Sequence, residues 1–476
     1  MTRNDQTSVG KSALFPMPED RTRIDDLLTR QLRDANDRVV AGHVSPTIDL
    51  AEFKKELTAF DFGQPRLSED TLAWIIARLE DGITHITNPR YFGLFNPAPT
   101  FPAQCADRIA AVFNPQLATS TTSPVPVALE AHVIRAIAQR AGFPETASGH
   151  FTTGGAEANY TALICALTRA CPGFALDGAR AFSGNPKFYI SRESHLAWLK
   201  IAHQAGIGRS AVRLVATDGT GRMSVAALQA AIAEDLVNGQ VPVMIVATAG
   251  TTNAGMIDPL AACGEIAREH GAWFHADAAW GGAVIASDRL RGLLAGIEAA
   301  DSMTIDAHKW FATTMGCGMF ITRDPGLLSS AFQVSTTYMP SNLKSLDPYV
   351  TSMQWSRRFL GLRLFLSLAA AGWAGYGEHI EHSVELAASL AHALRSLGWT
   401  VVNDSQLAVL CIQPPSGSSD VGSIVSKVLQ SGRAWISTAT FEGQAVIRAC
   451  LTHGETTQHD VDQLVDALRA AQYGRA

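Results

Sequence analysis

The sequence predicts an α/β protein in which a mostly parallel central sheet carries helices on both faces. Two observations support this class. Between residues 125 and 306, short runs rich in β-branched and aromatic residues alternate with helical segments, and this alternation is typical of parallel strands joined by crossover helices. Hydrophobic residues make up 47% and charged residues 17% of the 476-residue chain, so the chain can bury a substantial core and is not expected to be disordered.

The first hundred residues are expected to be mostly helical. Apolar residues recur at helical spacing at positions 25–40 and 68–83, within a helical region that extends over residues 20–85. Residues 88–102, with the sequence NPRYFGLFNPAPTFP, are rich in Pro, Asn and Phe and are too irregular for a long helix.

The alternation of helices and strands begins near residue 125. Helices are predicted over residues 126–142, 152–170, 224–236 and 259–271, and the second of these opens from a glycine turn. Strands are predicted at residues 187–191, 211–216, 241–249, 272–279 and 302–306.

The composition changes again beyond residue 365. A long helical region at 366–399 precedes strand-like runs at 407–413 and 444–451 and a final helix at 457–472, which predicts a smaller α+β domain. We therefore expect three parts: an N-terminal helical segment (1–100), a large α/β domain (101–365) and a small C-terminal domain (366–476). The polar, Pro-containing residues 333–354 are a candidate mobile loop.

Charge and cysteine content narrow the functional classes. Lys and Arg total 38 against 44 acidic residues, for a net charge of −6, and no basic block indicates nucleic acid as a partner. No apolar run of about twenty residues predicts a membrane span, and the polar N-terminus does not resemble a signal peptide. The seven scattered cysteines fit reduced thiols in a cytoplasmic protein, with no disulfide framework or metal site.

Two features of the central region are suited to binding an anion and a flat ring. Gly154 and Gly155, in TTGGAEAN, stand at a helix start, where free N–H groups and the helix dipole favour phosphate. Taken alone, a glycine turn before a helix is also consistent with an ordinary turn that binds no anion. His195 follows a short strand in SRESHLAW and is either structural or catalytic.

Two charged residues complete the set. Asp277, in WFHADAAWGG, ends an apolar strand, where a buried carboxylate needs a partner; a helix cap or a salt bridge would also explain it. Lys309, in DAHKW, ends a later strand, although lysine is rarely buried and commonly extends to solvent. Because ligands bind at the carboxyl ends of the strands in open α/β sheets, we expect these features to converge there.

One cofactor explains all four features. Pyridoxal phosphate needs an anion site, a lysine for a Schiff base, a carboxylate for its pyridinium nitrogen and a flat wall. The small residue Ala279, which follows Asp277, allows a flat group to lie against it. The sequence therefore predicts that Lys309 is interior because it binds the cofactor covalently.

At these residues the chain resembles the group II pyridoxal-phosphate-dependent amino-acid decarboxylases, which include the aromatic-amino-acid, glutamate and cysteine-sulfinate decarboxylases. The resemblance extends from NPRYFGLF to IRACLTHGETTQHDVDQLVDALR and is densest at TTGGAEAN, ATAGTTNAGMIDP, HADAAWGG, DAHKW and QWSRRF. It implies the PLP-dependent transferase fold type I and an obligate homodimer with active sites at the interface, the N-terminal helical segment serving dimerisation.

The resemblance also implies site residues. Lys309 matches the Schiff-base lysine, Asp277 the partner of the pyridine nitrogen, His195 the stacking histidine and Ala279 the small residue on the opposite face of the ring. The remaining cofactor positions are matched by Gly154, Gly155, Ala156, Thr252, Asp258 and His308. The family often has serines in the phosphate turn, so backbone N–H groups must supply more of the hydrogen bonds to the phosphate in this chain. Asp258 is also consistent with an ordinary turn aspartate before proline.

Two further residues are implied to act on substrate. Tyr338, in STTYMP, stands where family decarboxylases have a catalytic loop tyrosine and aldehyde-forming relatives tend to have phenylalanine; otherwise it is a surface tyrosine. Arg357, in QWSRRF, matches a family arginine near the substrate carboxylate or the cofactor phosphate. A loop of this kind closes over the site and excludes water.

The substrate side chain is expected to be apolar or aromatic. The pocket segment contains Leu94, Phe95 and Asn96, and Leu94 stands where aromatic decarboxylases tend to have tyrosine and glutamate decarboxylases glutamine. A leucine and phenylalanine wall offers no charge to a second carboxylate, which would be costly to bury unpaired. Aldehyde-forming oxidative decarboxylation, another pyridoxal-phosphate carbon–carbon lyase and a non-catalytic scaffold of the same fold remain alternatives.

Overall fold

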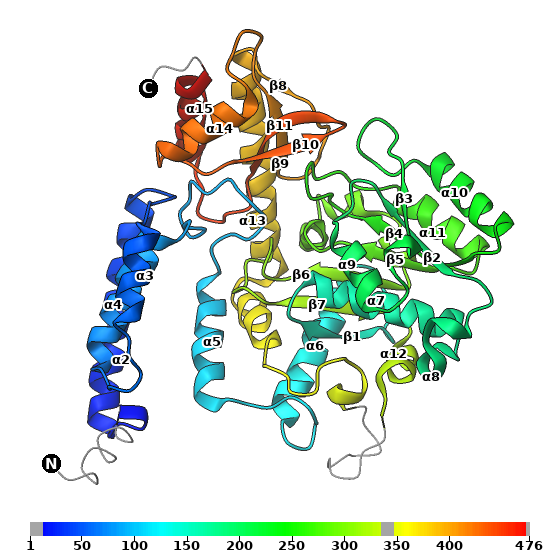
Figure 1. The fold of residues 1–476 in the computed structure, drawn as a ribbon, viewed down its shortest axis with the longest axis horizontal. Helices are drawn as coiled ribbons and strands as arrows, with labels where there is room; N and C mark the ends of the chain where they lie inside the picture. Colours follow the sequence, from blue (N-terminus) through cyan, green and yellow to red (C-terminus); the bar gives the residue numbers. More distant parts are fainter. Residues whose placement is uncertain (1–12, 335–346, 473–476) are drawn as a thin grey trace.

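The computed structural model describes residues 13–334 and 347–472 (Figure 1). Its centre is a seven-stranded sheet with the order β1-β7-β6-β5-β4-β2-β3. The strands are β1 (Ser148–Thr152), β2 (Pro186–Ser191), β3 (Val212–Val215), β4 (Val241–Thr248), β5 (Trp273–Asp277), β6 (Ser302–Asp306) and β7 (Gly318–Thr322). Within this sheet β7 runs antiparallel to both neighbours, β1 and β6, and the other pairs are parallel.

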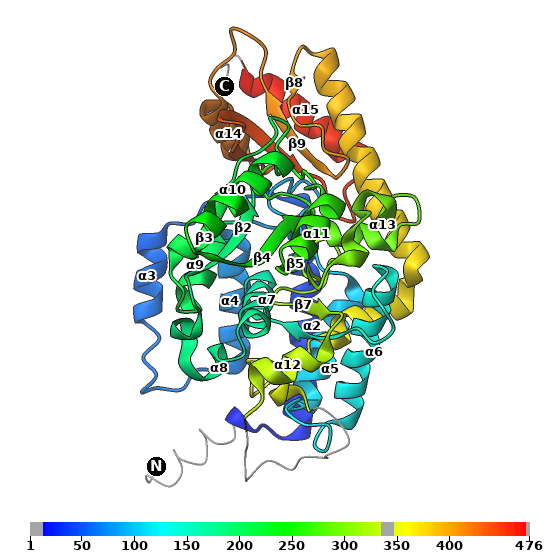
Figure 2. The same ribbon diagram turned by 90° about the vertical axis from the view of Figure 1, so that its right-hand side faces the viewer.

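Helices cover both faces of this sheet, as the sequence predicted (Figures 1 and 2). One buried cluster joins the sheet to α7 (Gly155–Ala170), α9 (Ala197–Gln204) and α12 (Pro325–Phe332). A second, larger cluster joins it to α6 (Pro124–Arg140), α10 (Val225–Val237), α11 (Leu260–Glu269) and α13 (Gly361–Ser396). The α/β class and the mostly parallel sheet are thereby confirmed.

A smaller domain lies at one end of the molecule (Figures 1 and 2). Its four-stranded antiparallel sheet has the order β10-β11-β9-β8 and is packed by α14 (Val421–Gln430) and α15 (Gln458–Gln472). The strands are β8 (Thr400–Val401), β9 (Val409–Gln413), β10 (Ser437–Phe441) and β11 (Gln444–Cys450). Helix α13 extends from the large sheet to this domain, across the predicted boundary at residue 365, and bends at Gly372, whose φ is 62°.

The N-terminal segment is helical. Helices α2 (Pro18–Ala41), α3 (Leu50–Thr58) and α4 (Ser68–Gly82) form a group at the edge of the molecule, beside α5 (Phe101–Phe113) (Figure 1). An ion pair of 3.3 Å between Arg108 and Asp25 links α5 to α2. The backbone N–H of Val44 donates to the carbonyl of Gly432 in the small domain at 3.0 Å.

Two strands of the large sheet were not predicted. β1 contains Gly149, at which a Cβ would lie 2.0 Å from the Phe320 carbonyl oxygen of β7. A residue without a side chain is therefore required there, and it weakens the β pattern in the sequence. β7 follows β6 after a short connection with no crossover helix, which explains its antiparallel direction.

No single helix in the described ranges is long and apolar enough to cross a membrane. One bent pair, Gly155–Ala170 with Phe174–Ala181, passes the same test by length and composition alone. The first of these helices is α7, whose residues belong to the buried core.

Candidate active site

The candidate site lies at the carboxyl ends of the parallel strands, the usual ligand position in open α/β sheets. A cavity of about 160 Å³ opens there. It is lined by these residues that the sequence singled out: Phe95, Gly155, Ala156, His195, Thr252, Asp277, Ala279 and Lys309. The cavity therefore brings together residues that are far apart in the sequence, from Phe95 to Lys309.

Lys309 follows the end of β6 in a tight turn. Its Nζ lies 3.0 Å from Oδ2 of Asp306, the last residue of β6. Asp306 is 3% exposed, and its Oδ1 has no hydrogen-bond partner among the described residues. Because a buried charge needs a partner, the Lys309 ammonium balances the Asp306 carboxylate.

Asp306 was missed by the sequence analysis. The signal was an acidic residue at a strand end three positions before the lysine, inside the DAHKW motif itself. Its carboxylate also faces the cavity, of which it is a lining residue.

Asp277 is the last residue of β5 and is 4% exposed. Its Oδ2 accepts hydrogen bonds from Asn159 Nδ2 at 2.9 Å and from Trp198 Nε1 at 3.3 Å. Its Oδ1 accepts one from the backbone N–H of Ala279 at 3.3 Å. Three donors thus fix the orientation of this carboxylate in the wall of the cavity.

The glycine turn that was predicted as an anion site precedes α7. Gly154 caps the helix with a φ of 156°, a conformation that favours glycine. A Cβ on Gly155 would lie 2.9 Å from Asp306 Oδ2, so a larger residue would crowd the site. The first N–H groups of α7 have no carbonyl within the helix to accept their hydrogen bonds and favour an anion.

His308 lies beside this turn without lining the cavity. Its Cε1 is 3.5 Å from the position of a Cβ on Gly154, and its Nδ1 lies 2.9 Å from the Cys317 carbonyl oxygen. The outer nitrogen of the ring therefore faces the region of the turn and of Asp306, whose Oδ2 is 4.0 Å from His308 Nε2.

Two residues could flank a flat ring. His195 is exposed, and its Nδ1 accepts a hydrogen bond from the backbone N–H of Ala197 at 3.1 Å. Ala279 is half-buried and adds only a methyl group to the wall. Amine, carboxylate, helix start and flat walls thus share one cavity, and this donor set fits pyridoxal phosphate.

Comparisons with known proteins agree with this chemistry. The family described as the pyridoxal-dependent decarboxylase conserved domain matches residues 64–413. The chain belongs to this family. An aromatic-L-amino-acid decarboxylase of Bacillus atrophaeus is 28% identical over 441 residues, which cover 90% of each chain.

Solved structures of similar proteins have the same fold. Mouse CSAD in its apo form has a TM-score of 0.90 at 25% identity and covers 96% of this chain and 100% of its own. Oryza sativa TDC with PLP and tryptamine has a TM-score of 0.89 at 22% identity, covering 96% and 98%. The resemblance inferred from the motifs is confirmed: the chain is a pyridoxal-phosphate-dependent amino-acid decarboxylase.

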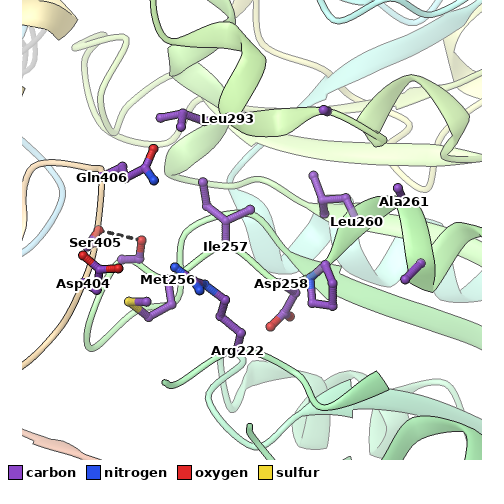
Figure 3. Close-up of a pocket in the computed structure, with 14 residues that line it drawn as sticks. Arg222, Met256, Ile257, Asp258, Leu260, Ala261, Leu293, Asp404, Ser405 and Gln406 are labelled. Atoms are coloured by element: carbon purple, nitrogen blue, oxygen red, sulfur yellow. Dashed lines mark hydrogen bonds between the residues drawn. The ribbon is translucent and has the colours of Figure 1, made fainter. Parts of the chain in front are cut away.

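Asp258 of this decarboxylase lies outside the cofactor cavity. It is 2% exposed and accepts hydrogen bonds from the backbone N–H groups of Met223 at 2.7 Å and Thr248 at 2.8 Å. It lines a separate pocket of about 430 Å³ with Arg222 and Asp404 (Figure 3). Burial raises the pKa of its carboxyl to about 7. These contacts describe a buried turn aspartate that links its turn to the end of β4 and to the loop before α10.

Arg357 is likewise not among the residues that line the cofactor cavity. Its guanidinium pairs with Glu130 at 3.2 Å, and the two side chains are 3% and 7% exposed. The other oxygen of Glu130 accepts a hydrogen bond from the backbone N–H of Gly361, at the start of α13. Arg357 therefore helps join α6 to α13, and we do not retain it as a substrate residue.

The three residues of the predicted substrate segment have different environments. Phe95 is 7% exposed and stacks on Trp280 with ring centroids 4.2 Å apart. Leu94 is 51% exposed, and neither Leu94 nor Asn96 lines the cavity. Tyr338 lies outside the described residues.

Arg448 was not predicted, although it lies next to the site. It is 3% exposed on β11, with its Cζ 4.5 Å from the centroid of the Phe95 ring. It donates to the carbonyl oxygens of Gly93 at 2.7 Å and Thr252 at 3.0 Å, while its Nη2 has no partner among the described residues. An arginine in the predicted strand at 444–451 was the only signal in the sequence.

Proposed function

We propose that this decarboxylase converts an apolar or aromatic L-amino acid into the corresponding amine and carbon dioxide. The observation that carries the proposal is that Lys309, Asp277 and the aromatic wall of Phe95 share one cavity. The stack of Phe95 on Trp280 supports an apolar wall. A second carboxylate on the substrate would be costly to bury against such a wall.

The residues in and beside the cavity have the following proposed tasks. When bound, the cofactor supplies an electron sink for the electron pair that remains after carbon dioxide leaves. Asp277 holds the proton on the ring nitrogen, and His195 and Ala279 flank the ring. Gly154, Gly155 and Ala156 donate backbone hydrogen bonds to the phosphate, with His308 beside them.

Arg448 is our proposed counter-charge for the substrate carboxylate. The support is its unpartnered Nη2, together with its place between Phe95 and Thr252, which both line the cavity. Arginine is well suited to carboxylates because its planar group donates in a fixed fork. Arg448 would thus orient the substrate without contributing to the choice of side chain.

A product screen tests this function. Purified protein loaded with pyridoxal phosphate should release amines from aromatic or apolar amino acids, and not from aspartate, glutamate or cysteine sulfinate. Mass spectrometry identifies the products: aldehyde with hydrogen peroxide would favour the oxidative alternative. The absence of a visible absorbance band that borohydride abolishes, together with no product, would favour a non-catalytic scaffold that has lost its cofactor.

Tyr338 is expected to determine which product forms. The proposal rests on the sequence match at STTYMP. Tyr338→Phe keeps the ring and removes the phenolic proton, so amine formation should fall by about 100- to 10,000-fold, the usual contribution of a positioned acid. Aldehyde and peroxide should appear under air and not under nitrogen. Amine formation at the parental rate would assign the proton to another donor, such as His195 or water.

We also propose that the enzyme acts as a homodimer with shared active sites. The support is a row of exposed apolar side chains on α5: Phe101 (74%), Ile109 (42%), Val112 (81%) and Phe113 (78%). Apolar patches of this kind mark protein–protein contacts. A second copy is the proposed partner, because the N-terminal helices beside α5 expose further apolar residues, including Leu32 and Leu79, and obligate interfaces are large and hydrophobic.

Val112→Glu is expected to produce monomers with little activity, because it places a charge in the proposed interface. Light scattering and turnover measure the two effects. Val237→Glu is the matched control: this valine is 88% exposed at the end of α10, far from α5 in both views (Figures 1 and 2). A fully active monomer of Val112→Glu would contradict the proposal.

We also propose a cytoplasmic location and the three-part division of the chain. All seven cysteines are free, which supports a reducing compartment such as the cytoplasm. The division between the large and the small domain is supported by their separate sheets, although α13 crosses the proposed boundary at residue 365.

A further inference from the structure

Behind Asp277, four buried side chains form a continuous series of hydrogen bonds. Asn159 Nδ2 donates to Asp277 Oδ2 at 2.9 Å, and Asn159 Oδ1 lies 3.1 Å from His275 Nε2. On the other edge of the imidazole, His275 Nδ1 lies 2.8 Å from Ser302 Oγ. Ser302 Oγ in turn lies 2.8 Å from Trp273 Nε1. The series thus crosses from α7 through β5 to β6.

The direction of each hydrogen bond follows from its chemistry. An indole N–H can only donate, so Ser302 Oγ accepts from Trp273 and has its own proton free for His275. A carboxylate oxygen can only accept, so Asn159 turns Nδ2 toward Asp277 and Oδ1 toward His275. The amide oxygen also only accepts, so His275 Nε2 carries the ring proton and donates to it. Nδ1 of the neutral imidazole then accepts from Ser302 Oγ.

The neutral state of His275 is required for this order. An imidazolium would donate from both nitrogens and could not accept from Ser302. His275 is 0% exposed, and burial lowers the pKa of its imidazole to about 4. The ring stays neutral throughout the pH range in which the enzyme would be assayed.

We propose that Asn159, His275 and Ser302 are positioning residues that keep Asp277 ionised and aimed at the ring nitrogen of pyridoxal phosphate. The inference rests on the proposed role of Asp277. If His275 no longer donates from Nε2 to Asn159 Oδ1, the amide of Asn159 is free to rotate and to present Oδ1 to the carboxylate. Asp277 then loses a donor, its charge is less stabilised, and the proton moves from the ring nitrogen toward the carboxylate.

Ser302→Ala and Thr304→Val form a matched pair of variants. Both hydroxyls are on β6, and both residues are fully buried. Ser302 supplies the proton to His275 Nδ1, whereas Thr304 Oγ1 lies 3.3 Å from Nε2, where it only shares the proton that Nε2 already donates. Neither residue lines the cofactor cavity. Any effect of these substitutions on the protonation of the cofactor must therefore be transmitted through the series of hydrogen bonds.

The first measurement uses the cofactor-free protein. Nitrogen-15 NMR of labelled histidine, with His275 assigned by difference from His275→Gln, should show Nε2 protonated and Nδ1 unprotonated in the parent and in Thr304→Val. Ser302→Ala should populate the opposite tautomer. A parent signal with the proton on Nδ1, or a charged ring at neutral pH, would overturn the inference.

The second measurement uses protein loaded with ring-15N pyridoxal phosphate. The parent and Thr304→Val should give a protonated ring nitrogen. Ser302→Ala should shift this signal toward the unprotonated form and weaken cofactor binding about 10-fold, the usual effect of losing a hydrogen bond to a charged group. An unchanged signal and unchanged affinity in Ser302→Ala would refute the inference.

Asp277→Asn separates this inference from the proposed site. Loss of the protonated signal in Asp277→Asn with no change in Ser302→Ala would reject only the positioning series. A protonated signal retained in Asp277→Asn would reject the role of Asp277 itself.

Discussion

Lys309→Ala is expected to abolish decarboxylation while leaving a protein that binds pyridoxal phosphate without a covalent bond. Lys309 is the lysine that lines the cavity, within 3.0 Å of Asp306. The glycine turn and Asp277 remain in the variant to hold the phosphate and the ring nitrogen. Borohydride reduction followed by peptide mapping should label Lys309 in the parent and no lysine in the variant.

Lys200→Ala is the control for this experiment. Lys200 is exposed on α9, the helix that begins two residues after His195, so its loss should change neither the label nor the turnover. A label on Lys200 or on any other lysine, or turnover by Lys309→Ala at the parental rate, would remove the basis of the proposed site.

Lys309→Ala is also expected to destabilise the protein, because Lys309 is the ion-pair partner of Asp306. Removing the lysine leaves a carboxylate that is 3% exposed without its ammonium partner, and an unsatisfied buried polar group costs about 1–3 kcal/mol or more if charged. The cofactor-free Lys309→Ala protein should therefore unfold at a lower temperature than the parent. The double variant Lys309→Ala, Asp306→Asn should recover part of that loss, because it removes the unpaired charge.

The sequence identified several residues that line the cavity, but not the residues packed behind them. Lys309, Asp277 and the glycine turn could be placed because each stands at the end of a recognisable strand or the start of a helix, and parallel strands bring such ends together. Strands β1 and β7 were missed because β1 contains a glycine required by close packing and because β7 has no crossover helix before it.

Residues that act through packing between distant elements could not be found in this way. Asn159, His275 and Ser302 come from three elements, and their hydrogen bonds depend on strand register: β5 pairs with β6 so that His275 lies opposite Ser302. Arg357 matched a motif, yet its ion pair with Glu130 depends on how α6 packs against the start of α13. Spacing along the chain carries no information on either arrangement.

Asp277→Ala is expected to reduce the rate of decarboxylation by at least about 100- to 1,000-fold, the usual cost of removing one preorganised electrostatic group. Asp277 is the cavity carboxylate whose orientation is fixed by three hydrogen-bond donors. Without it, the ring nitrogen has no anion to retain its proton, and the electron pair left by carbon dioxide is less stabilised. Steady-state kinetics at saturating cofactor measure the loss.

A cofactor with a permanent charge separates this electrostatic role from a structural one. Pyridoxal phosphate methylated on its ring nitrogen is positive without any proton, and the alanine side chain leaves room for the methyl group. Asp277→Ala loaded with this analogue should therefore regain much of the lost rate. The parent should lose activity with the same analogue, because the methyl group would meet a carboxylate held in place by Asn159 and Trp198. If the analogue restores nothing in Asp277→Ala although it binds, then Asp277 shapes the site and does not act through its charge.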